Sequence, residues 1–136
     1  TKRSIYFEQN IMNEIVGSQD QAVATYGGFN KIIFNKNGSI NVKKIKFTKN
    51  LKLLNGNLVL IFTGINRTAH YIAQKYVGKL TTTKKKYINK IISYVDQGEK
   101  ILNSGNIDDF GRLLNEAWQE KKKLSNEISN RKIDEL

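Results

Sequence analysis

The sequence predicts an α+β fold, and three observations in its 136 residues carry that prediction. Apolar and polar residues alternate over residues 29–34 and again over 40–47, on either side of a turn sequence Asn-Lys-Asn-Gly-Ser, which predicts a β-hairpin. Residues 57–63 form a short, mostly apolar run that predicts an interior strand. Apolar residues at helical spacing over 82–103, and again after Gly105, predict two longer amphipathic helices. The expected order is α-α-β-β-β-α-α-α.

The N-terminal region is expected to hold two helices before the hairpin. Apolar residues at helical spacing predict the first helix over residues 3–16, ended by Gly17. Ser18, followed three residues later by Gln21, fits a capping box that begins a short second helix. Gly27 is expected to end this helix in a left-handed conformation. After the hairpin, residues 51–54 are expected to form a short connector.

The second half of the chain is expected to be mainly helical. Asn66 is a suitable N-cap for a helix over residues 67–76, which Gly78 ends. The helix over 82–103 carries an apolar stripe that we expect to be buried. The stripe consists of Tyr87, Ile88, Ile91, Ile92, Val95, Ile101 and Leu102. Asn106 is expected to cap the helix that follows Gly105.

The composition excludes several classes of protein. The chain contains no cysteine, so it has no disulfide scaffold, no thiolate zinc site and no cysteine nucleophile. Its single histidine, His70, and the absence of a metal-ligand spacing predict no metal site built by this chain. The longest apolar run, residues 58–62, is far shorter than the ~20 residues of a membrane helix. The N-terminus does not resemble a secretion signal, so a cytoplasmic protein without membrane contact is expected.

Positive charge is concentrated in the middle of the chain. The chain carries 23 Lys and Arg against 12 Asp and Glu, and residues 21–95 hold fourteen of these basic residues and no acid. Such a region attracts phosphorylated metabolites or nucleic acid, although a solvated lysine-rich surface has the same composition. A nucleic-acid-binding module using residues 21–95 is therefore one hypothesis. Its stacking residues would be Tyr26, Phe29, Phe34 and Phe47, which the alternation assigns instead to a core.

The stretch of residues 17–29 is the best candidate for a functional site. It places the carboxylate of Asp20 at the start of a helix, between Gln19 and Gln21, with Gly27 and Gly28 closing the helix. A carboxylate there can orient or deprotonate a hydroxyl group, while the amides hydrogen-bond its neighbours and the glycines let the backbone approach a ligand. A plain capped turn in a non-catalytic interaction domain is the alternative. The candidate substrate-binding residues are Gly17, Gln19, Gln21, Gly27 and Gly28.

Three segments resemble the GHMP kinases, the superfamily of galactokinase, homoserine kinase and mevalonate kinase. The first is the Gly-x-x-Asp-Gln…Gly-Gly pattern that begins at Gly17. The second is Phe-Thr-Gly-Ile-x-Arg, which ends at Arg67 and is similar to a segment of the sugar-phosphate branch. The third runs from Asp109 to Trp118. Together they are spread over nearly the whole chain and are most similar to the branch that acts on heptose 7-phosphates.

The resemblance implies ATP-dependent phosphorylation of a sugar phosphate, at the anomeric hydroxyl of a heptose 7-phosphate, on the way to nucleotide-activated heptose. It implies ATP and Mg²⁺ as cofactors and a small sugar phosphate as the partner, with nucleic acid not expected. Asp20 takes the position of the family's active-site aspartate. Arg67 is the candidate for holding the substrate phosphate, because a guanidinium group can bind phosphate through two hydrogen bonds.

The sequence departs from the family at both nucleotide-binding loops. The Pro-x-x-x-Gly-Leu-Gly-Ser-Ser loop and the C-terminal glycine-rich motif are absent from these 136 residues, and family members are more than twice as long. We therefore expect an internal part of the two-lobed GHMP fold, inactive by itself. Residues 1–56 are expected to end the N-terminal lobe, and residues 57–136 to begin the ferredoxin-like C-terminal lobe. No nucleotide-binding residue and no oligomeric state can be named.

Overall fold

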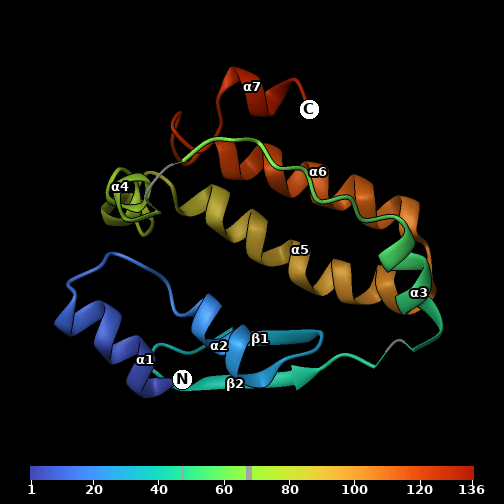
Figure 1. Ribbon diagram of the computed structural model, residues 1–136, viewed down its shortest axis with the longest axis horizontal. Coiled ribbons are helices and arrows are strands. Elements are labelled where there is room, and N and C mark those ends of the chain that lie inside the picture. Colours follow the sequence, from blue (N-terminus) through green and yellow to red (C-terminus); the bar gives the residue numbers. More distant parts are fainter. Residues whose placement is uncertain (47, 67–68) are drawn as a thin grey trace. The chain divides into compact units, whose positions relative to one another are not determined.

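The computed structural model describes residues 1–46, 48–66 and 69–136 and divides into two compact units, Thr1–Lys46 and Phe47–Leu136 (Figure 1). The structure combines helices with one small antiparallel sheet, which is compatible with the α+β prediction. The elements of the first unit are α1 (Lys2–Tyr6), the π-helix η1 (Phe7–Ile11), α2 (Gln19–Tyr26), β1 (Asn30–Phe34) and β2 (Ile40–Lys44). Those of the second are α3 (Thr48–Gly56), α4 (Ala69–Gln74), the 3₁₀-helix η2 (Val77–Lys79), α5 (Lys85–Ser104), α6 (Ile107–Lys122) and α7 (Arg131–Asp134).

The first helix is shorter than predicted. It ends at Ile11, so the prediction of helix over residues 12–16 is wrong. Two local features end it. The amide of Met12 donates to the carbonyl of Phe7 at 2.9 Å, and Asn13 has a φ of +53°, a left-handed conformation that asparagine tolerates better than most residues.

Helix α2 begins where the sequence predicts, but without the predicted capping box. The Ser18 side chain makes no capping hydrogen bond. The side-chain amide of Gln21 instead donates to the carboxylate of Glu8. Gly27 ends the helix with the expected positive φ, +55°, but its ψ of 172° lies outside the left-handed helical region. The helix therefore stops because Gly27 leaves helical geometry altogether.

The β-hairpin is confirmed. Strands β1 and β2 pair antiparallel, with Ile32 opposite Val42. The turn closes through a hydrogen bond from the Asn35 amide to the Ser39 carbonyl at 2.9 Å, and Gly38 supplies a φ of +78°. These two strands make up the sheet seen in the described residues, so the structure has a two-stranded sheet where the sequence predicted three strands.

The region after the hairpin differs most from expectation. Residues 51–54, expected as a connector, belong to helix α3, and the side-chain amide of Asn50 in this helix donates to the carbonyl of Leu102 at 2.9 Å. The predicted interior strand over residues 57–63 is wrong, because the segment is extended without strand pairing. Leu60 in this segment is 101% exposed. The apolar pattern suits a strand, but a strand needs a neighbour to supply its hydrogen bonds.

The core of the second unit lies between the antiparallel helices α5 and α6 (Figure 1). The buried side chains are Leu54, Tyr94, Leu102, Leu113, Leu124 and Ile128. Gly98 brings the helices close, since a Cβ atom there would lie 3.4 Å from the Leu113 side chain. The predicted stripe on α5 is correct for Leu102 but wrong for Ile92 and Val95, which are 61% and 48% exposed. The buried positions of α5 are 94, 98 and 102, one narrow line along the helix.

The ends of the later helices follow their capping signals. The side chain of Asn106 caps α6 by accepting from the Asp109 amide at 3.1 Å, as predicted.

Near the C-terminus, the Lys122 ammonium group lies 3.0 Å from the Asp134 carboxylate and, with the Ser129 hydroxyl, lowers the pKa of Asp134. Arg67 and the beginning of its predicted helix lie outside the described residues. Among the helices that are described, none has the length and apolar character to span a membrane.

Candidate active site around Asp20

Asp20 lies in the first turn of α2 with its side chain exposed. The first peptide N–H groups of a helix have no partner within the helix, and the helix dipole makes this end positive. Both effects favour a carboxylate at this position. Within the described ranges, no hydrogen bond or ion pair engages the Asp20 side chain. Asp20 is therefore open to a hydroxyl group that approaches from solvent.

The two glutamines beside Asp20 have different surroundings. Gln19 is exposed, next to Asp20 at the start of the helix. Gln21 turns toward the body of the unit, where its amide nitrogen donates to Glu8 and its amide oxygen is buried with no donor among the described residues. Buried amide oxygens usually accept a hydrogen bond, so this oxygen can accept one from a water molecule or a ligand hydroxyl.

The loop that leads into α2 is held by the end of η1. The side-chain amide of Gln9 donates to the carbonyl of Val16 at 2.9 Å, and the amide of Glu14 donates to the carbonyl of Glu8 at the same distance. The contact between Gln21 and Glu8 adds a third connection from the first helical region to α2. These contacts fix the position from which Asp20 projects.

The glycines of the candidate site have two different roles. Gly27 and Gly28 both have positive φ, +55° and +72°, and the side-chain amide of Asn30 donates to the Gly27 carbonyl at 2.7 Å. With a ψ of 172°, Gly27 lies near a region of backbone conformation that is essentially restricted to glycine. Gly17 has no positive φ and open space around it. The backbone therefore requires glycine at 27 but not at 17.

We expect Gly27→Ala to lower the free energy of unfolding of the first unit by about 1–3 kcal/mol, because its backbone conformation strains any side chain. Gly17→Ala is the matched control, and we expect a change of less than about 0.5 kcal/mol. Thermal unfolding followed by circular dichroism measures both. Equal losses in the two variants would contradict the conclusion that the backbone requires glycine at position 27 but not at position 17.

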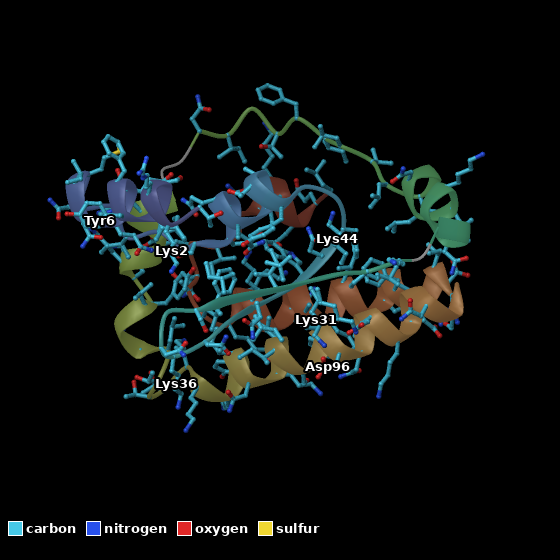
Figure 2. All side chains as sticks on the ribbon, turned by 90° about the horizontal axis from the view of Figure 1, so that it is seen from below. Lys2, Tyr6, Lys31, Lys36, Lys44 and Asp96 are labelled. Carbon is cyan, nitrogen blue, oxygen red and sulfur yellow. The ribbon has the colours of Figure 1, made fainter. Side chains whose placement is uncertain are left out.

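The first unit contains a cavity of about 390 Å³, and Ser18, the residue before α2, is part of its lining. Amide and hydroxyl side chains line the cavity together with the aromatic rings of Tyr6 and Phe34. The lining also includes the ammonium group of Lys2, which lies on helix α1 with Tyr6 (Figure 2). Its polar lining residues are Gln9, Asn10, Ser18, Asn35 and Ser39. Of these, only Ser18 lies in the stretch 17–29 that the sequence singles out; the others come from a helix and a hairpin turn that no local pattern connects to it.

The chemistry of this region suits a polar, hydroxyl-rich ligand. Amide and hydroxyl side chains can donate to and accept from sugar hydroxyls, and the Lys2 ammonium can pair with a phosphate. The cavity volume is within the range of small-molecule sites. In the part of the chain that the structure describes, no cluster of three or more His, Cys, Asp or Glu side chains could hold a metal ion. His70, in the second unit, is half-buried and contacts Gln74.

Comparison with known proteins points to a class of enzyme. No protein-family model and no solved structure matches the chain. The chain is similar to a curated sugar-phosphate kinase. That relative is D-glycero-alpha-D-manno-heptose 7-phosphate kinase of Campylobacter jejuni subsp. jejuni serotype O:2, 27% identical over 137 aligned residues that cover 99% of this chain. The chain spans 40% of the length of this relative.

Proposed function

We propose that this chain is part of an ATP-dependent sugar kinase of the GHMP type that phosphorylates the anomeric hydroxyl of D-glycero-D-manno-heptose 7-phosphate. The observation that carries the proposal is the similarity to the Campylobacter kinase along 99% of the chain. The exposed carboxylate at the start of α2 supports it, because the resemblance of the segment that begins at Gly17 implies a catalytic aspartate at this position. The parent protein would belong to the biosynthesis of nucleotide-activated heptose.

In the proposed reaction, Asp20 orients the anomeric hydroxyl and accepts its proton as the hydroxyl oxygen bonds to the γ-phosphorus of ATP and the bond from that phosphorus to ADP breaks. The positive end of the α2 dipole lies beside this carboxylate. Bound ATP would supply the phosphoryl group and Mg²⁺ would neutralise charge on it. We assign neither to residues of this chain, since the described residues contain no carboxylate cluster for a metal. The residues of this chain would hold the acceptor hydroxyl in position for the transfer.

The remaining candidate residues would bind the sugar phosphate. We propose that Gln19 donates to a sugar hydroxyl beside Asp20, and that the buried amide oxygen of Gln21 accepts from another. Gly17, Gly27 and Gly28 would let the backbone approach the sugar ring. For the phosphate we propose Arg67, whose guanidinium group suits a bidentate contact. In the parent fold, residues 1–56 would end the N-terminal lobe and residues 57–136 would begin the C-terminal lobe.

A titration of the isotope-labelled 136-residue chain with D-glycero-D-manno-heptose 7-phosphate tests the proposal. We expect saturable amide shift changes in residues 17–28 and in the cavity lining, without formation of ADP when ATP is added. Inorganic phosphate is the control, and we expect weaker effects centred on basic side chains. Shift changes of equal size with phosphate and sugar phosphate would show that only charge is recognised, against the proposal.

One observation favours nucleic-acid binding as a second candidate function. The aromatic residues expected in a core are partly exposed, with Tyr26 at 44%, Phe29 at 40% and Phe34 at 47%. Exposed aromatic rings on a basic hairpin can stack on bases. A single-stranded oligonucleotide added in the same titration separates the two functions. Strong binding with a steep salt dependence, shifting these aromatic residues, would favour nucleic acid over the sugar phosphate. Phe47 lies outside the described residues.

A further inference from the structure

The turn of the β-hairpin contains an asparagine followed by a glycine, Asn37-Gly38, and then Ser39. All three residues are exposed. Asparagine is thermolabile, because the nitrogen of the next peptide group can attack its side-chain carbonyl carbon. A glycine in the next position lacks the Cβ atom that would hinder this attack. The turn therefore presents a reactive pair to solvent.

Ser39 polarises the side-chain carbonyl group of Asn37. The backbone amide of Ser39 donates to Asn37 Oδ1 at 3.0 Å, and its hydroxyl group donates to the same oxygen at 2.7 Å. Attack on Cγ moves negative charge onto Oδ1. Two donors that already point at this oxygen stabilise the charge as it develops. The turn therefore favours attack on Asn37 through its own hydrogen bonds.

One hydrogen bond of the turn opposes the attack. The Gly38 amide donates to the Asn35 carbonyl at 2.9 Å, which keeps the attacking nitrogen engaged. This bond lies at the exposed end of a two-stranded hairpin, where local opening costs little free energy. The contacts from Ser39 to Asn37 span only two residues and do not depend on that bond. The carbonyl group therefore stays polarised when the turn opens.

We propose that Asn37 is a site of spontaneous deamidation and that Ser39 is the positioning residue that favours it. The Gly38 nitrogen loses its proton to hydroxide and bonds to Asn37 Cγ. The bond from Cγ to the side-chain nitrogen breaks, and this nitrogen takes a proton from water and leaves as ammonia. The product is a five-membered succinimide ring. Water opens the ring at Cγ to give aspartate, or at the main-chain carbonyl carbon to give isoaspartate.

Both products change the surroundings of the cavity in the first unit. Gly38 and Ser39, the two residues after Asn37, line that cavity. Aspartate places a negative charge next to them. Isoaspartate also adds a methylene group to the main chain, inside a turn that the hydrogen bond from the Asn35 amide to the Ser39 carbonyl closes at 2.9 Å. The reaction itself does not depend on the proposed function.

Incubation of the 136-residue chain at neutral and mildly alkaline pH, followed by peptide mapping with mass spectrometry, tests the proposal. We expect Asn37 to convert to a mixture of aspartate and isoaspartate, at a rate that rises with hydroxide concentration. Asn55-Gly56 is the internal control. It is the same pair of residues and is also exposed, but it lies in helix α3, where helical hydrogen bonds hold the backbone. We expect slower conversion at Asn55.

Ser39→Ala tests the contribution of the hydroxyl group. We expect it to lower the rate at Asn37 by about two- to tenfold, the effect of one hydrogen bond of ordinary strength. Ser39→Thr keeps a hydroxyl group and should restore the wild-type rate. Hydrogen exchange of the Gly38 amide measures how often the turn opens in each chain, so the rates are compared at equal opening. No conversion at Asn37, conversion at Asn55 as fast as at Asn37, or an unchanged rate in Ser39→Ala would overturn the proposal.

Discussion

Leu102→Ala is expected to lower the free energy of unfolding of the unit Phe47–Leu136 by about 2–5 kcal/mol. Leu102 is 2% exposed and is the last of the buried positions along α5. Removing its side chain loses apolar burial and leaves a cavity that two rigid helices cannot close. Urea unfolding of the chain, followed by the helical circular dichroism signal, measures the loss.

Ile92→Ala is the matched control for this prediction. Both changes shorten a branched aliphatic side chain on the same helix, but Ile92 is 61% exposed. We expect its effect to stay within about 0.5 kcal/mol, because little apolar burial is lost. If both substitutions destabilised the unit equally, helix α5 would be buried on the face that the sequence predicted rather than along positions 94, 98 and 102.

Two elements with local signals, the hairpin and the cap of α6, were predicted correctly, although the local capping box at Ser18 was not. The hairpin follows from alternation and the Asn-Gly turn, which act within a few residues. The cap of α6 follows from Asn106, whose side chain reaches only to Asp109. In both cases the residues that determine the structure are neighbours in the sequence, so the pattern contains all that is needed.

Elements that depend on distant partners were predicted poorly. Residues 57–63 have the composition of an interior strand, but strand pairing is decided by a second segment, and the described structure supplies none. Helix α3 was missed because it is short and is stabilised by contacts with residues distant in the sequence, such as the hydrogen bond from the Asn50 side chain to the Leu102 carbonyl. The periodicity of α5 predicted that the helix has an apolar face, but it did not show which of the apolar residues are buried.

The candidate site also combines features that the local sequence predicts with features that depend on residues distant in the sequence. The positive φ of Gly27 and the position of Asp20 in the first turn of α2 follow from the local sequence. The contact between Gln21 and Glu8 joins residues thirteen apart, and the cavity joins a helix, a cap and a hairpin turn. Sequence reasoning gave the catalytic candidate, whereas the residues that position it became visible only in the fold.

Asp20→Asn is expected to reduce sugar-dependent ADP formation by about 10²–10⁴-fold, the usual contribution of a positioned acid or base. Asparagine keeps the size of the side chain and one acceptor oxygen, but it cannot accept the hydroxyl proton. The suitable background is the Campylobacter jejuni kinase with its matching region, 40% of its length, replaced by this chain. The loss should appear in kcat with little change in KM, since the proton is transferred only as the phosphoryl group moves.

Asp108→Asn in the same chimera is the control. Asp108 is also an exposed acid in the first turn of a helix, α6, so the substitution removes the same charge from an equivalent position. If the loss of a negative charge from the first turn of any helix of this chain were responsible, both variants would lose similar activity. A folded chimera without sugar-dependent turnover would contradict the proposed function, and a full-rate Asp20→Asn variant would remove Asp20 from it. A loss confined to Asp20→Asn identifies the proton-accepting group, because charge, exposure and helix position are matched in the two variants.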